Sequence, residues 1–351
     1  MKIAEITRVY GTHRFGGMPL KSQIFSEALV NQGHEVFVLT TSLGKQDSTM
    51  LGEVNGVKIY YLNVPSMQYS DAWWTESNKK FQELHSEIGF DILHSESYGG
   101  YAVKTNIPKF ATLHGTGFGL IETYSIMRAL GYKVDIQKAM SGYVNEVRVY
   151  KNFDKLIAVS KKEQRILKQK YFHKKIELLY NPINEIFFNK LWQGDGDYYF
   201  CYGICCPEKG QRYLNRLAEK IKILFAGNVN PGGKVVYMGE LSQEEIAEHL
   251  VRCKGFINPT LYSKGFDLTT CEALAVGTPV FCSYIQVDED LEDMKNCVFI
   301  DPTDPDLYRR IISISEDLGL CKSLSKNAKF DAANMFHPKK VISRFLTLIG
   351  E

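Results

Sequence analysis

The chain lacks the features that mark several common protein classes. No apolar run approaches the ~18 residues that a membrane-spanning helix needs, and residues 1–11 have the pattern of a strand followed by a polar loop rather than that of a signal peptide. The net charge is only +2, which indicates no nucleic-acid partner. We therefore expect a soluble protein located in the cytoplasm.

Cysteine is absent from the first 200 residues, since all eight cysteines lie at or after Cys201. Cys201, Cys205 and Cys206 crowd one predicted loop, but no Cys-x-x-Cys pair occurs, which disfavours a zinc or redox site. Free thiols in a reducing compartment are expected instead. The uneven distribution also indicates that the two halves of the chain are different domains.

The first part of the chain alternates strands, glycine-rich loops and helices. A strand at residues 2–10 leads into a loop, and a helix follows from near Pro19 to Gly33 before the next strand at 35–42. This order is typical of a doubly wound sheet, in which ligands meet the carboxyl ends of the strands. The loop contains no G-x-G-x-x-G, so a nicotinamide cofactor is not indicated. The predicted core face of this helix carries Leu20, Ile24, Phe25, Ala28 and Leu29.

The most informative stretch is residues 258–283, NPTLYSKGFDLTTCEALAVGTPVFCS. Its pattern predicts a buried strand, a Gly- and Thr-containing loop, a short apolar helix and a second strand of a parallel sheet. A helix N-terminus of this kind suits a phosphate group. Glu272, which we expect in the first turn of the helix, can accept hydrogen bonds from sugar hydroxyls. A diphosphate with an attached ribose would fit both features.

Residues 264–280 resemble the donor-binding signature of retaining nucleotide-sugar glycosyltransferases of the family 4 type, which includes sucrose synthase and bacterial mannosyltransferases. That signature reads E-G-F-G-L, three residues, E-A, two or three residues, G-T-P-V. Lys264 stands in place of the first Glu, and Asp267 stands in place of the second Gly. The resemblance implies an α/β protein of the GT-B fold, with two Rossmann-like doubly wound domains facing a central cleft. The matching residues are Gly265, Phe266, Leu268, Glu272, Ala273 and 277–280.

The resemblance also divides the chain. Residues 1–183 correspond to the acceptor-side domain, residues 184–334 to the nucleotide-sugar donor domain, and residues 335–351 to a terminal helix that crosses back to the first domain. The linker is expected near residues 182–195.

The second domain carries part of the family's G-R-L-x-x-x-K-G pattern, whose Arg and Lys neutralise the donor diphosphate. Lys209 is present, but Ile204 stands in the Arg place. The resemblance implies that Lys209 and the backbone of residues 268–270 hold the phosphates, while Glu272 holds the ribose. The implied donor-binding set is Gly16, Gly17, Lys209, Lys264, Gly265, Phe266, Leu268, Thr269, Thr270 and Glu272.

Two glycines in the first domain resemble the family's paired glycines, whose bare backbone lets a donor or acceptor approach. These are Gly16 and Gly17, although such a pair can also be a simple turn. Arg14 beside them can reach a phosphate or be solvated.

Histidines and tryptophans supply the other candidates in the first domain. His114 matches a family histidine beside the anomeric region of the donor sugar, so His114 and Glu272 are the catalytic candidates. His94 could face the acceptor or be a hydrogen-bonded structural residue. The tandem Trp73 and Trp74 could stack on an acceptor sugar or a membrane interface, or pack against the domain.

Residues 121–153 are predicted to be helical and carry five basic residues. Their surface could lie on an anionic membrane or be an ordinary solvated face, and the second interpretation is favoured. The acceptor could be a glycan, a lipid-linked molecule or a protein. The sequence does not indicate an oligomeric state.

Sugar transfer from a nucleoside diphosphate requires stabilisation of the departing diphosphate, which cationic side chains and a helix N-terminus can supply. No Asp-x-Asp motif stands at the end of a predicted strand, so we expect neither a metal nor a cofactor. The resemblance further implies retention of anomeric configuration, by front-face attack guided by the leaving phosphate.

The departures from the family pattern leave alternatives open. Lys264 could replace the missing cation at Ile204, could meet a carboxylate on an acidic donor sugar, or could mark lost catalysis. Two classes of protein therefore remain. The favoured one is an active glycosyltransferase, and the other is a non-catalytic subunit of the same fold that binds a sugar nucleotide or a partner protein. An epimerase is disfavoured because no matching acid and base carboxylates are found.

Overall fold

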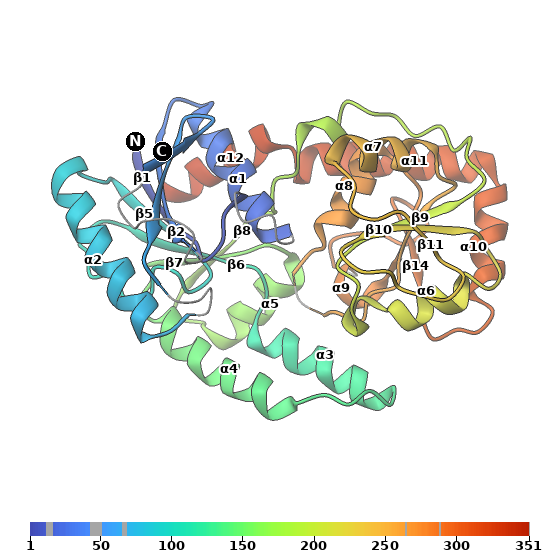
Figure 1. Ribbon diagram of the computed structural model, residues 1–351, viewed down its shortest axis with the longest axis horizontal. Helices are drawn as coiled ribbons and strands as arrows, with labels where there is room; N and C mark the ends of the chain where they lie inside the picture. The colour runs from blue at the N-terminus through green and yellow to red at the C-terminus, as the bar shows by residue number, and fades with distance from the viewer. Residues whose placement is uncertain (12–16, 43–50, 65–68, 264, 288, 351) are drawn as a thin grey trace. The chain divides into compact units, whose positions relative to one another are not determined.

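The structure is a computed structural model of the chain, and it describes residues 1–11, 17–42, 51–64, 69–263, 265–287 and 289–350. The chain folds into two compact units (Figure 1). Unit 1 consists of residues 1–117, 137–182 and 341–351, and unit 2 of residues 118–136 and 183–340.

Unit 1 is built on an eight-stranded sheet with the order β3-β4-β2-β1-β5-β6-β7-β8. All neighbouring strands are parallel except β3 and β4. The order reverses between β1 and β5, which makes this the switch point of a doubly wound sheet. The strands are β1 (Lys2–Ile6), β2 (Glu35–Thr41), β3 (Leu51–Val54), β4 (Val57–Leu62), β5 (Ile92–Glu96), β6 (Lys109–Leu113), β7 (Lys155–Ala158) and β8 (Lys175–Leu178).

Helices cover both faces of this sheet (Figure 1). α1 (Gly17–Val30) and α12 (Pro338–Ile349) pack on one face, where Phe25 and Phe345 belong to the same buried cluster as Ile3 and Val38. α2 (Asp71–Ile88) packs on the opposite face. α4 (Ile136–Tyr150) and α5 (Lys161–Lys170) complete the unit and pack with β6 and β7.

The observed core face of α1 differs from the prediction. Leu20, Ile24 and Ala28 are only partly buried, whereas Lys21, Ser22 and Ser26 are buried together with Phe25 and Leu29. The reason is that the sheet presents buried carboxylates to this helix, so polar side chains meet polar partners there.

Unit 2 contains a six-stranded, wholly parallel sheet with the order β11-β10-β9-β12-β13-β14. This is the doubly wound order, and its switch point lies between β9 and β12. The strands are β9 (Tyr199–Gly203), β10 (Ile223–Gly227), β11 (Val236–Tyr237), β12 (Phe256–Asn258), β13 (Val280–Ser283) and β14 (Val298–Ile300). The helices are α6 (Gln211–Leu217), α7 (Gln243–Arg252), α8 (Leu268–Val276), α9 (Tyr284–Val287), α10 (Leu307–Glu316) and α11 (Leu318–Met335).

Most of α3 (Gly117–Ala129) belongs to unit 2, although it comes from the part of the chain that was assigned to the first domain. Met127 is buried against Tyr213 and Leu261. Ser263 donates its backbone N–H to Oγ1 of Thr123 at 2.9 Å. These contacts tie residues 118–136 to the loop after β12. Among the described helices, none is long and apolar enough to cross a membrane.

Candidate active site

A polar cluster lies at the switch point of unit 2, where the loops after β9 and β12 meet. The β9 loop contains a short 3₁₀ helix (Pro207–Lys209), and the β12 loop leads into α8. The turn at Gly210 has φ +78°, and a Cβ there would lie 2.0 Å from the carbonyl oxygen of Pro259. Leu261 N donates to the carbonyl oxygen of Glu208 at 2.8 Å. A glycine at position 210 therefore lets the two loops pack directly against each other.

Glu272 is buried in this cluster, with 3% of its surface exposed. It is the fifth residue of α8 and so lies in the second turn rather than in the predicted first turn. The hydroxyl of Tyr202 donates a hydrogen bond to its carboxylate. Burial raises the pKa of Glu272 to about 7, and the hydrogen bond from Tyr202 acts in the opposite direction. Glu272 is therefore close to half ionised at neutral pH.

Lys209 is held by Asp267, whose Oδ1 accepts a hydrogen bond from Nζ. The other Asp267 oxygen accepts from Nδ2 of Asn258 at 3.1 Å, and Asn258 also donates to Oγ1 of Thr270 at 2.9 Å. Burial acts against the charge of Lys209, but Asp267 more than compensates and raises the pKa of the ammonium group. The predicted phosphate-binding lysine is thus already paired with an internal anion.

The remaining residues around the N-terminus of α8 have different roles. Phe266 is buried and its ring packs against Phe336, so the ring supports the loop that leads into α8. Gly265 adopts φ +71°, which suits glycine. Thr269 is half-buried, and its carbonyl oxygen accepts from the Tyr202 hydroxyl at 3.3 Å. Leu268 begins α8.

A second polar cluster lies at the switch point of unit 1, around the fully buried carboxylate of Glu96 at the end of β5. One oxygen of Glu96 pairs with Nζ of Lys21 from α1, and the other contacts Nε2 of His114 just after β6. Burial tends to raise the pKa of Glu96, but the charges of Lys21 and then His114 outweigh it and hold this pKa well below its usual range. Glu96 is therefore an ionised anchor for Lys21 and His114.

His114 is the member of this cluster that reaches the surface, with 13% of its side chain exposed. The chain after it is fixed because the buried carboxylate of Glu146 accepts a hydrogen bond from the backbone N–H of Gly117. Glu96 contacts the ring of His114 and Glu146 fixes the backbone that follows it, so together they restrict the position of the His114 side chain.

Glu5 lies beside Glu96 on the adjacent strand β1 and is also fully buried. Ser26 from α1 donates to Oε2 of Glu5 at 2.7 Å. Burial, followed by repulsion from Glu96, raises the pKa of Glu5 to about 8, so this carboxyl group is mostly protonated at neutral pH. With His94, the two carboxyls could form a metal-ligand set, but Lys21 and His114 already occupy both oxygens of Glu96.

The prediction that His94 faces an acceptor is wrong. Its ring is fully buried between Phe25 and Phe345, and its Nε2 is hydrogen-bonded to Oγ1 of Thr112 at 2.8 Å. Burial lowers the pKa of His94 to about 3, so the ring is neutral. The alternative of a hydrogen-bonded structural histidine is the one that the structure has.

Trp73 is also a core residue rather than an acceptor contact. It is fully buried, and its Nε1 donates to the carbonyl oxygen of Gly99 at 3.1 Å. Trp74 is half-buried and packs edge-on against Tyr101 at 5.3 Å between ring centroids. The tandem pair therefore anchors α2, because an apolar face is most stable against the core.

Three predicted residues, Arg14, Gly16 and Lys264, lie outside the described residues, and so does the predicted compensation of Ile204 by Lys264. Gly17 is the first residue of α1 and is exposed. Ile204 is 52% exposed at the end of β9.

Four residues of the two clusters were missed as functional candidates: Tyr202, Asn258, Glu96 and Lys21. A charged, amide or hydroxyl-bearing residue at the carboxyl end of a predicted parallel strand was the available signal for Tyr202, Asn258 and Glu96. Lys21 carried no such signal, because it lies within a predicted amphipathic helix.

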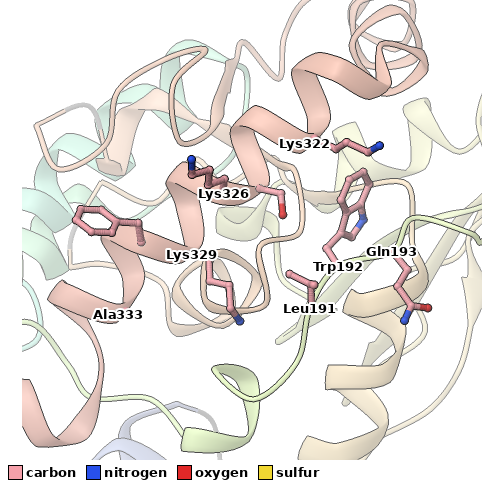
Figure 2. A pocket seen from close by; sticks show the side chains of 9 residues that line it. Leu191, Trp192, Gln193, Lys322, Lys326, Lys329 and Ala333 are labelled. Atoms are coloured by element: carbon pink, nitrogen blue, oxygen red, sulfur yellow. The ribbon is translucent and has the colours of Figure 1, made fainter.

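A separate surface cavity of about 650 Å³ lies in unit 2 and contains none of the predicted site residues (Figure 2). Leu191, Trp192 and Gln193 of the linker line one side, and α11 lines the other. Nζ of Lys329 donates to the carbonyl oxygens of Phe188, Lys190 and Ala275. This lysine thus joins the linker to the end of α8, which is a structural role.

Two family models match the chain. The model described as Glycosyltransferase Family 4 matches residues 22–185, and the model described as Glycosyl transferases group 1 matches residues 205–317. An uncharacterized glycosyltransferase of Methanocaldococcus jannaschii is 25% identical over 94% of this chain and 93% of its own length.

Solved structures show the same fold. Sucrose-phosphate synthase of Thermosynechococcus elongatus superposes with a TM-score of 0.82 at 18% identity, over 99% of this chain and 98% of that one. Anabaena HepE, in complex with UDP-glucose, gives a TM-score of 0.72 at 15% identity over 99% of both chains. The predicted GT-B class is confirmed. The chain thus carries a Glycosyltransferase Family 4 domain at residues 22–185 and a Glycosyl transferases group 1 domain at residues 205–317, on the GT-B fold.

Proposed function

We propose that the protein transfers a sugar from a nucleoside diphosphate sugar to an acceptor hydroxyl, with retention of configuration and without a metal ion. One observation carries this proposal: the end of β9, the loop after it and the first turns of α8, at the switch point of unit 2 where doubly wound sheets bind ligands, carry both the Lys209–Asp267 pair and the Tyr202–Glu272 pair. HepE, a protein of the same fold, was solved with UDP and with UDP-glucose.

In this proposal the nucleotide binds to unit 2. The ionised form of Glu272 accepts hydrogen bonds from the ribose hydroxyls, and Tyr202 keeps its carboxylate in place. Lys209 and the N-terminus of α8 stabilise the negative charge that develops on the departing diphosphate. No side chain has to form a covalent bond.

The transfer step exchanges one bond for another at the anomeric carbon. The acceptor oxygen forms its bond on the face from which the diphosphate departs, and the acceptor proton passes to the departing phosphate oxygen. His114, oriented by Glu96, contacts the sugar in this step. The acceptor is a glycan, a lipid-linked molecule or a protein.

A non-catalytic, sugar-nucleotide-binding role is the second candidate, and the pairing of Lys209 with Asp267 favours it. A lysine engaged by an internal carboxylate attracts a diphosphate less strongly. Such a protein would bind a nucleotide sugar without turning it over.

The test is a thermal-shift screen against UDP-, GDP-, ADP- and TDP-sugars, because a ligand that binds the native state raises the melting temperature. The proposal predicts a rise with one nucleotide and loss of this rise in Glu272→Ala. Product analysis by NMR then gives the anomeric configuration. A donor that binds and is never consumed with any acceptor supports the non-catalytic role, and no shift with any donor contradicts both.

A further inference from the structure

Asp267 places a negative charge at the N-terminus of α8, the position where an anionic ligand would be most stable. Its two carboxylate oxygens bond to Lys209 and Asn258. Asn258 is in turn fixed by its hydrogen bond to Thr270. The carboxylate is thus held in place by side chains from both loops of the cluster.

The charges of Lys209 and Asp267 cancel each other. Both side chains are mostly shielded from water, with 30% of Lys209 and 14% of Asp267 exposed, so their interaction is screened less than that of a surface pair. An incoming diphosphate therefore competes with Asp267 for Lys209, and the negative charge of Asp267 repels the diphosphate.

We propose that Asp267 is a specificity-determining residue that makes the site bind the sugar-bearing donor in preference to the free nucleoside diphosphate. This inference rests on the proposed function. At neutral pH the phosphates of a nucleoside diphosphate sugar carry roughly two negative charges, whereas those of a free nucleoside diphosphate carry roughly three. Repulsion from Asp267 grows with the charge of the ligand, so it weakens the product more than the donor.

The consequence concerns the end of the reaction cycle. Cleavage of the sugar–phosphate bond leaves the acceptor proton on the departing oxygen, and once the nucleoside diphosphate loses this proton it carries more negative charge than the donor did. Asp267 then repels the product more strongly than it repels the donor, which eases the departure of the product. Product release limits the turnover of many enzymes, so a residue that weakens product binding favours turnover.

The test is isothermal titration of the native chain and of Asp267→Asn with UDP, GDP, ADP and dTDP, each beside its glucose conjugate. Asparagine keeps the size of the side chain and removes its charge. For the nucleotide that binds, we expect Asp267→Asn to bind the free diphosphate roughly tenfold more tightly and the glucose conjugate only about threefold more tightly. Asp267→Gly, with no side chain, is a second variant, and the melting temperature of each variant verifies its folding.

Two controls make the result specific. Asp197→Asn removes an exposed aspartate of unit 2 that pairs with Lys222, and it should leave every affinity unchanged. Lys209→Met combined with Asp267→Asn, compared with Lys209→Met alone, should lose the part of the gain that comes from competition for Lys209 and keep the part that comes from direct repulsion by Asp267.

Equal or weaker binding of the free diphosphate in Asp267→Asn overturns the inference and leaves the proposed function intact. So does an equal gain for the free diphosphate and the glucose conjugate. If no nucleotide binds the native chain or either variant, the proposed function fails and the inference fails with it.

Discussion

The hydroxyl of Tyr202 donates a hydrogen bond to the carboxylate of Glu272, and both side chains are buried. Tyr202 is the last residue but one of β9 and Glu272 lies on α8, so the contact joins β9 to the helix that follows β12 at the switch point of unit 2. The pair fixes the position of a carboxylate whose ionisation near neutral pH is set by its burial.

Donor binding should depend on pH through Glu272. Its pKa is raised to about 7, and only the ionised form accepts two hydroxyl hydrogen bonds, so nucleotide affinity should rise as the pH increases through 7. Tyr202→Phe removes a bond that lowers this pKa and should move the midpoint to higher pH, with a loss of affinity of about three- to tenfold at pH 7. Titration calorimetry between pH 5.5 and 8.5 measures both effects, and an unchanged midpoint in Tyr202→Phe would contradict them.

Folding stability should depend on pH through Glu5. The pKa of Glu5 is raised to about 8 in the folded state, so the native state retains a proton that the unfolded state loses near its ordinary pKa of 4.5. The free energy of unfolding should therefore fall as the pH rises from about 5 to 8. Glu5→Gln should remove on the order of 2–4 kcal/mol of this decline. Urea denaturation at pH 6 and at pH 8.5 measures the free energy of unfolding of the native chain and of Glu5→Gln. An equal decline in both proteins would exclude Glu5 as the source of the pH dependence.

Neutralising Glu96 should destabilise unit 1. Lys21 is 2% exposed, and Glu96→Gln would leave its charge buried without a counter-charge. We expect a loss of about 3–5 kcal/mol in the free energy of unfolding, with partial recovery in Lys21→Met/Glu96→Gln. Glu35→Gln is the matched control, because Glu35 pairs with Lys58 on the surface and its removal should cost less than about 1 kcal/mol. A small loss in Glu96→Gln, similar to that of the control, would show that the buried pair contributes little.

His114 should matter for transfer and not for nucleotide binding. Because the proposed contact is to the sugar, His114→Ala should lower kcat/KM by about 10- to 100-fold and leave the Kd of the free nucleoside diphosphate within about twofold. Steady-state kinetics with the donor from the thermal-shift screen, together with calorimetry of its nucleotide, separates the two. If His114→Ala lowered kcat/KM and the affinity for the nucleoside diphosphate by the same factor, His114 would contact the nucleotide rather than the sugar.

The alternation of strand and helix signals was sufficient to predict the doubly wound sheet of unit 1, because parallel strands are buried on both faces and appear as short apolar runs between helices. The second doubly wound sheet was expected from the family resemblance. The segment from Asn258 to Ser283 folds as the expected strand, loop, helix and strand, with Gly277 ending α8 at φ +83°. The sequence was sufficient to predict the secondary structure of this segment, because the end of a helix and the extent of a short strand are set largely by residues close by in the sequence.

The predictions that failed concern residues whose roles depend on distant partners. His94 and Trp73 were placed near a ligand from residue type alone, but Phe345 and Gly99 supply the contacts that bury them. Lys21 was overlooked for the same reason, because its partner Glu96 lies 75 positions away in the sequence.

In the proposed function, Glu272 holds the ribose of the nucleotide. This role is tested by comparing the affinity for UDP with the affinity for 2′,3′-dideoxy-UDP, which lacks both ribose hydroxyls. If the thermal-shift screen selects another base, the corresponding pair of nucleotides is used. Calorimetry is performed on the native chain, Glu272→Gln and Glu272→Ala. We expect loss of the ribose hydroxyls to weaken nucleotide binding to the native chain by about 10- to 100-fold, and to change the affinity of Glu272→Ala very little. The same loss in all three proteins, or no loss in the native chain, would contradict this role of Glu272.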